Sequence, residues 1–264
     1  MYALHQSLLA AHISAGAVAL VSFWIPVFAR KGSAWHVSAG MLYARCMVLV
    51  AWSALALSVV TAIDPIGVRG LAAVAPERAA AIISQSREFA AFLGFLGLAT
   101  LSGIRSGLNA VRSRRRVASP PTRADLALNF AVPASAAAML IVGIVRRNPL
   151  FLGLSLTVLV LRLMRLRRPS ATRFSWMYEH LSAMLGTGIG AYTAFFVFGG
   201  RRLFSAYLPG SWQLLPWFLP TILGVPAITL TVRYYRTRFE PAGRLAGASD
   251  GRAEVPRGIP TPTL

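Results

Sequence analysis

Residues 126–145 read LALNFAVPASAAAMLIVGIV, a run of twenty residues that contains no charged side chain. Arg123 and Asp125 come just before it, and Arg146 and Arg147 follow it directly. An α-helix needs about 20 apolar residues to cross the roughly 30 Å hydrocarbon core of a bilayer, and basic residues at its ends lie among the headgroups. This stretch therefore predicts a transmembrane helix.

Comparable apolar runs occur along most of the chain. Together they predict seven spans, at about residues 8–28, 42–63, 89–111, 126–145, 150–166, 178–199 and 214–234. We therefore expect an all-α fold, a polytopic bundle of seven transmembrane helices that forms one domain over residues 1–235. Residues 236–264 are rich in Pro, Gly and Arg, which predicts a disordered tail.

The composition agrees with a membrane protein and excludes most soluble classes. The 264 residues include 27 Lys+Arg against 8 Asp+Glu, for a net charge of +19, yet only 13% of the chain is charged and 56% is hydrophobic. A soluble domain is about 25% charged. The mean hydropathy is +0.59. The bases also form separate clusters between the spans, whereas a nucleic-acid partner would require one large basic field. We expect no nucleic-acid partner.

The distribution of the bases predicts the orientation. With the N-terminus outside, the inner segments hold 20 Lys+Arg and the outer segments hold 7. Cytoplasmic loops carry the excess of basic residues, so we expect an N-out, C-in multi-pass protein of a bacterial inner membrane, with a cytoplasmic tail. We expect the inner clusters to attract anionic lipid headgroups at the cytoplasmic face.

The fifth run, 150–166, is the weakest of the seven. Arg162 and Arg165 shorten its uncharged part to about a dozen residues, against the roughly 20 that a span needs. Without this span the best division of the same bases falls to 16 against 11. The charge distribution therefore favours seven spans over six.

No motif in the sequence indicates an enzyme. The His-Glu-x-x-His, Gly-x-Ser-x-Gly and phosphate-loop signatures are absent from the sequence. Cys46 is the single cysteine, so neither a disulfide framework nor a Cys-based metal site is expected. Gly186 and Gly190, four residues apart in the sixth run, predict a face for close helix packing.

Histidines near the ends of the spans are the candidate ligands. His12 lies inside the first span, His180 lies inside the sixth, and His36 lies in the first inner loop or at the foot of the second helix. At 1.5 Å per residue, about 20 Å of membrane separates the depths of His12 and His180, so they cannot bind one iron. His36 and His180 fall on the same side of the membrane if the fifth run crosses it. A bis-imidazole site for haem b near the cytoplasmic surface is therefore possible.

Three functions remain open from the residues alone. The first is a non-enzymatic membrane protein in which His12, His36 and His180 bind a ligand or support the structure. The second is a b-type haem protein that transfers electrons, with His36 and His180 as axial ligands. The third is a small-solute or lipid transporter, in which prolines break the seventh span and create a polar cavity near Thr221 and Thr229.

Both ends of the chain resemble an uncharacterised family of bacterial multi-pass membrane proteins, described only as predicted membrane proteins. The residues that carry the resemblance near the start are His12, Gly16, Lys31-Gly32, His36, Gly40 and Tyr43. Those near the end are Trp176, His180, Met184, Thr193-Ala194-Phe195, Leu208-Pro209, Trp217, Pro220-Thr221, Gly224 and Arg233-Tyr234-Tyr235.

The middle of the chain is similar to that family only in hydropathy. Where the family tends to have arginines after the loop histidine and after the glycine, this chain has Val37 and Met41, and Arg45 is the nearest base. The resemblance implies the architecture and directs attention to the three histidines, but it implies no reaction.

Overall fold

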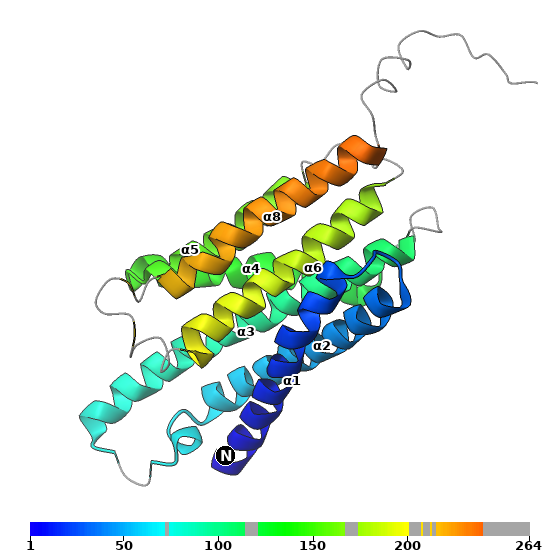
Figure 1. Ribbon diagram of the computed structural model, residues 1–264. Coiled ribbons are helices and arrows are strands. Elements are labelled where there is room, and N and C mark those ends of the chain that lie inside the picture. Colours follow the sequence, from blue (N-terminus) through cyan, green and yellow to red (C-terminus); the bar gives the residue numbers. More distant parts are fainter. Residues whose placement is uncertain are drawn as a thin grey trace, which may run out of the picture.

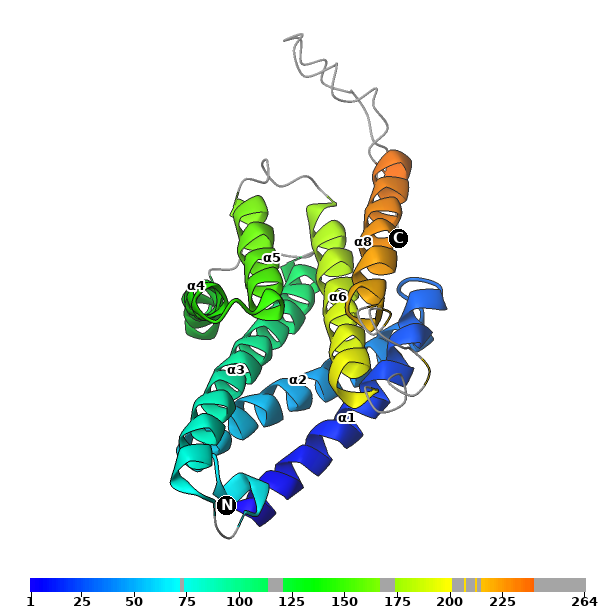
Figure 2. The same cartoon turned by 90° about the vertical axis from the view of Figure 1, so that its left-hand side faces the viewer.

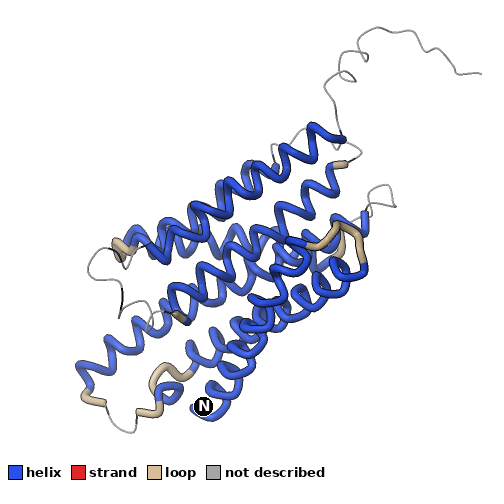
Figure 3. The backbone as a smooth tube through the Cα atoms, viewed as in Figure 1, coloured by secondary structure: helices blue, strands red, loops and turns tan. Residues whose placement is uncertain are grey.

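The computed structural model describes residues 1–71, 74–113, 121–166, 174–200, 207, 212 and 215–239. Its helices are α1 (Tyr2–Phe28), α2 (Ala34–Ile63), η1 (Gly67–Arg69), α3 (Pro76–Ser113), α4 (Arg123–Val145), α5 (Pro149–Leu166), α6 (Ser175–Ala194), η2 (Phe195–Gly199) and α8 (Leu215–Phe239). The described residues contain no strand (Figure 3). The all-α fold is confirmed.

The predicted runs coincide with the long helices, although several helices begin before the apolar run does. α3 begins at Pro76, a residue favoured in the first helical turn, well ahead of the run at 89–111. α8 continues to Phe239, so residues 236–239 are helical and do not belong to the predicted tail. The rest of that tail, 240–264, lies outside the described residues.

Five of the described helices are long and apolar enough to cross a membrane. They are α1, α2, α3, α4 and the continuous segment Ser175–Gly199, which joins α6 to η2. The apolar part of α5, Pro149–Met164, is shorter, about 24 Å at 1.5 Å per residue. The chain is thus an α-helical bundle with the composition of a membrane protein.

The helix directions show that α5 reverses the chain as a crossing helix would. His36 on α2 faces His180 on α6, and two turns further along both helices the hydroxyl of Tyr43 lies 3.0 Å from that of Thr187. α2 and α6 are therefore parallel. From α2 to α6, each helix runs antiparallel to the one before it. Without the reversal at α5, α6 would run antiparallel to α2.

Arg162 does not prevent α5 from packing into the bundle. Its guanidinium donates hydrogen bonds to Asn129 Oδ1 on α4, at 3.3 Å, and to Ser102 Oγ on α3. The charge that shortens the apolar run thus lies against two neighbouring helices, with polar acceptors on both.

The two ends of the described chain lie at opposite ends of the bundle (Figure 1). Tyr2 lies against Gly70 at one end, and Phe239 stacks on Phe174 at the other, with 5.2 Å between ring centroids. This arrangement is the one expected of an odd number of crossings.

α3 and α6 form the middle of the bundle, between α1 and α2 on one side and α5 and α8 on the other (Figure 1). Figure 2 shows α8 beside α6, and α4 beside α5. The core between α1, α2, α3 and α6 contains Phe23, Tyr43, Met47 and Ile104.

Glycines set the closest helix contacts, but not the ones that the sequence predicts. A Cβ on Gly186 or Gly190 would meet no described atom within 4 Å, so the predicted packing face does not contact the described part of the bundle. Gly188, between them, lies directly against the ring of Phe23 on α1.

Candidate functional site

His36 and His180 lie side by side where α2 and α6 begin. His36 is the third residue of α2, and His180 is the sixth residue of α6. The centroids of the two imidazole rings are 6.4 Å apart, and the ring planes are inclined by 67°. The structure therefore brings together the two histidines that the sequence analysis placed on one side of the membrane.

Each ring is oriented by a backbone carbonyl. His36 Nδ1 lies 3.0 Å from the oxygen of Pro26, and His180 Nδ1 lies 2.9 Å from the oxygen of Gly107. A carbonyl oxygen can only accept, so both Nδ1 atoms carry the proton and donate it. In the neutral rings the Nε2 atoms then keep their lone pairs, which is the form that coordinates a metal.

A close approach of α3 to α6 makes the Gly107 carbonyl available to His180. A Cβ on Gly107 would lie 3.1 Å from the sulfur of Met184, and a Cβ on Gly103 would collide with Thr187. Gly103 and Gly107 are four residues apart and therefore share one face of α3, so α6 can pack directly on that backbone. This Gly-x-x-x-Gly pair is the signal in the sequence that could have identified the contact.

The connection between α1 and α2 supports His36. Lys31 Nζ donates to the carbonyl oxygens of Pro26, at 2.8 Å, and Val27, at 2.7 Å, and so caps the end of α1. Ser33 caps α2 by accepting the N–H of His36, with 3.3 Å between nitrogen and oxygen. Partial burial lowers the pKa of the Lys31 ammonium. The Pro26 carbonyl thus holds both Lys31 and His36 in place.

The donor set of this site fits a metal group that brings most of its own ligands. Within the described residues, no cluster of three or more His, Cys, Asp or Glu side chains surrounds a common point. A structural zinc ion almost always takes four protein ligands. Haem brings most of its iron ligands in its own porphyrin, so two imidazoles are enough protein ligands to hold its iron. The residues present therefore fit haem better than a bare metal ion.

His12 is not part of this pair. Its Nδ1 lies 3.1 Å from the carbonyl oxygen of Val50 and 2.9 Å from Ser53 Oγ, so it joins α1 to α2. On α1 it is fourteen residues from Pro26, about 21 Å along the helix axis. The structure thus separates His12 from the other two candidate ligands.

The hydroxyls proposed to line a transport cavity lie on the outside of α8. Thr221 and Thr229 are exposed, and the Thr229 hydroxyl donates to the carbonyl of Val225 in its own helix, at 2.8 Å. α8 also continues through Pro220 and Pro226 without a break. The polar cavity that a transporter would need is therefore not formed by these threonines.

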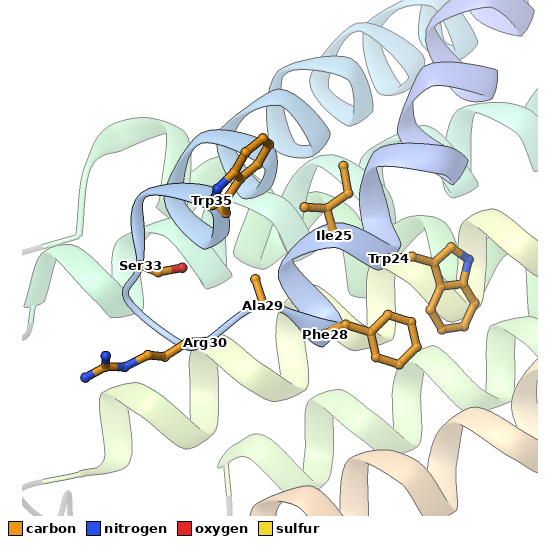
Figure 4. A pocket seen from close by; sticks show the side chains of 7 residues that line it. All are labelled: Trp24, Ile25, Phe28, Ala29, Arg30, Ser33 and Trp35. Carbon is orange, nitrogen blue, oxygen red and sulfur yellow. The ribbon is translucent and has the colours of Figure 1, made fainter.

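A shallow groove lies next to the site, at the connection between α1 and α2 (Figure 4). Its lining residues are Trp24, Ile25, Phe28, Ala29, Arg30, Ser33 and Trp35. Most of the lining is apolar, and Arg30 is its one charged residue.

No family model, curated protein or solved structure matches this chain. The geometry of the His36–His180 pair is therefore the observation from which a function is proposed.

Proposed function

We propose that this protein is a non-enzymatic membrane protein that binds b-type haem between His36 and His180 and transfers electrons at the end of the bundle where α2 and α6 begin. The observation that carries the proposal is the paired placement of two imidazoles whose Nδ1 protons are both donated to backbone carbonyls. Histidines that bind metals are commonly oriented in this way.

The two rings are close enough to hold one group between them, because the centroids of His36 and His180 are 6.4 Å apart.

Each residue then has a defined role. His36 and His180 would hold the haem iron through Nε2, while the carbonyls of Pro26 and Gly107 hold the rings in orientation and keep the proton on Nδ1. Haem, when bound, would supply one-electron chemistry, which suits electron transfer.

Basic residues indicate on which side of the membrane the histidine pair lies. The end of the bundle that carries His36 and His180 also carries Arg30, Lys31 and the arginines of the last turn of α8, Arg236 and Arg238. Basic residues gather at the cytoplasmic side of a membrane protein. We place this end in the cytoplasm and the N-terminus outside, in a bacterial inner membrane.

A visible spectrum tests the haem site. The full chain, expressed with ample haem supply and purified in detergent, is expected to show a Soret band whose intensity corresponds to about one haem per chain. Replacing either His36 or His180 with alanine is expected to remove most of this band, because each supplies one of only two axial ligands.

His12→Ala is the matched control, because His12 is also a half-buried histidine, but within the described residues its ring forms hydrogen bonds with Val50 and Ser53 instead. It is expected to retain the band. Absence of a Soret band in the wild-type protein, or equal loss in all three variants, would refute the haem site. Metal analysis of the same samples shows separately whether a metal without porphyrin depends on His36 and His180.

A further inference from the structure

The groove at the connection between α1 and α2 exposes large apolar side chains. Phe28 is 80% exposed and Trp35 is 73% exposed. The rings of Trp24 and Phe28 stack with their centroids 5.7 Å apart. Trp24 is further held by a hydrogen bond from its indole N–H to the hydroxyl of Tyr192, at 2.5 Å. The groove is thus an ordered aromatic surface, of the kind that is found where a helix leaves the hydrocarbon.

Positive charge lies at one end of this surface. Arg30 is exposed, and no hydrogen bond or ion pair links its guanidinium to the described residues, whereas Lys31 is occupied by the carbonyls of Pro26 and Val27. Arg30 extends away from the apolar side chains (Figure 4). Next to it, α2 begins at Ala34 after the Ser33 cap, with the positive end of its dipole toward the groove.

An apolar wall with a cationic end is complementary to an amphiphile with an anionic head. Arg30 offers paired N–H donors to a phosphate, and the start of α2 favours the same charge. The apolar side chains of the groove offer a surface for an acyl chain. The acyl chain of a zwitterionic lipid would pack against the aromatic side chains equally well, but its headgroup would bring no net charge to Arg30.

We propose that this groove binds one anionic phospholipid, with its phosphate at Arg30 and the start of α2, and an acyl chain along Trp24, Phe28 and Trp35. The site needs no haem at His36 and His180. We expect the inner basic clusters to attract anionic lipid headgroups, and the groove gives one such lipid a defined binding position.

Fluorescence quenching tests the occupant directly. The full chain is reconstituted in phosphatidylcholine vesicles that contain a small mole fraction of dibrominated phosphatidylglycerol, or the same fraction of dibrominated phosphatidylcholine. Bromine quenches only the tryptophans that the labelled chain contacts. One favourable basic contact corresponds to about a fivefold preference for the anionic lipid, so phosphatidylglycerol is expected to quench at a mole fraction about fivefold lower.

Three variants assign the effect to the groove. Trp35→Phe is expected to reduce the component that anionic lipid quenches preferentially, and Trp24, the other tryptophan of the groove, accounts for the remainder. Arg30→Gln is expected to abolish the preference between the two lipids. Arg78→Gln makes the same charge change at an exposed position in the first turns of α3, away from the groove, and is expected to keep the preference. Circular dichroism checks that each variant retains its helical content.

Each contrary result would overturn the proposal. Equal quenching by the two lipids would show that the groove does not select charge. Equal effects of Arg30→Gln and Arg78→Gln would show a general surface-charge effect. If Trp35→Phe leaves the preferential quenching unchanged, the lipid lies elsewhere, and if neither lipid quenches Trp35, another occupant such as a second copy covers the groove.

Discussion

Three histidines of one chain have different hydrogen-bond partners. His36 and His180 each use Nδ1 on a single carbonyl and lie ring to ring. His12 has a carbonyl and a hydroxyl as neighbours and connects two helices. The residue type alone therefore does not decide which ring nitrogen of a histidine is available to a ligand. The hydrogen-bond partner of the other ring nitrogen decides it.

Asp125 is another residue whose role comes from its partners. It forms a capping box with Thr122 at the start of α4. Its Oδ1 also accepts hydrogen bonds from Arg105, at 2.9 Å, and from Asn109, at 3.1 Å, both on α3. One carboxylate thus begins α4 and ties it to α3.

We expect Asp125→Ala to lower the thermal unfolding midpoint in detergent. The variant loses the capping box and leaves Arg105 without its acid, and the loss of a cap alone costs about 0.5–2 kcal/mol. Glu77→Ala, which removes an exposed acid from the first turn of α3, is the control and is expected to change the midpoint little. Equal shifts of the unfolding midpoint in the two variants would mean that the loss of a negative charge, and not the loss of the α3–α4 contact, is responsible.

At the scale of the helices, α6 depends on the absence of side chains at particular glycines. Gly188 lies against Phe23 of α1, and Gly224 of α8 lies against Ile189 of α6. The alternate glycines Gly186 and Gly190 meet no described atom within 4 Å. Only some of the glycines on this helix therefore control its packing.

Gly188→Ala is expected to destabilise the protein, because its new Cβ would collide with the Phe23 ring. Overpacking a tight contact typically costs about 1–3 kcal/mol. Gly186→Ala, two residues away in the same helix, adds a Cβ in open space and is expected to be neutral or stabilising, by up to about 1 kcal/mol. Thermal unfolding of the two variants measures the difference, and a similar loss in both would contradict the Gly188–Phe23 contact.

At the scale of the whole molecule, successive long helices alternate in direction, and this includes α5. α2 and α6 run parallel to each other, which is consistent only with a reversal of the chain between α4 and α6. The Arg162 contacts with Asn129 and Ser102 explain how a helix with too short an apolar run still packs along the bundle.

A topology map tests this arrangement in the membrane. Reporters inserted after Arg147 and near residue 170 are expected on opposite sides, the first outside and the second in the cytoplasm. A reporter after Phe239 is expected in the cytoplasm as well, because seven crossings from an outside N-terminus end inside. If the reporters at 147 and 170 lie on the same side, α5 does not cross and the histidine pair cannot be at a cytoplasmic face.

Much of the fold was predictable because a membrane imposes local requirements. An apolar run of sufficient length is a helix wherever it occurs, since its backbone polar groups have no water to bond. The run at 126–145 therefore became α4 with almost the same bounds. The apolar run does not mark the first turns of α3, because the helix begins at Pro76 and Glu77, where the preference of proline for the first helical turn, and not hydropathy, decides.

The sequence by itself determined the helices, their approximate ends, the asymmetric distribution of charge and the three histidines worth considering. All of these depend on short stretches of chain. Only the tertiary structure decided that His36 and His180 face each other, that Pro26 and Gly107 orient them, and that His12 does not join them. These contacts depend on which helix faces meet, and those faces are chosen by packing at Gly103, Gly107 and Gly188 between segments far apart in the chain, where a single Cβ changes the distance between two helices.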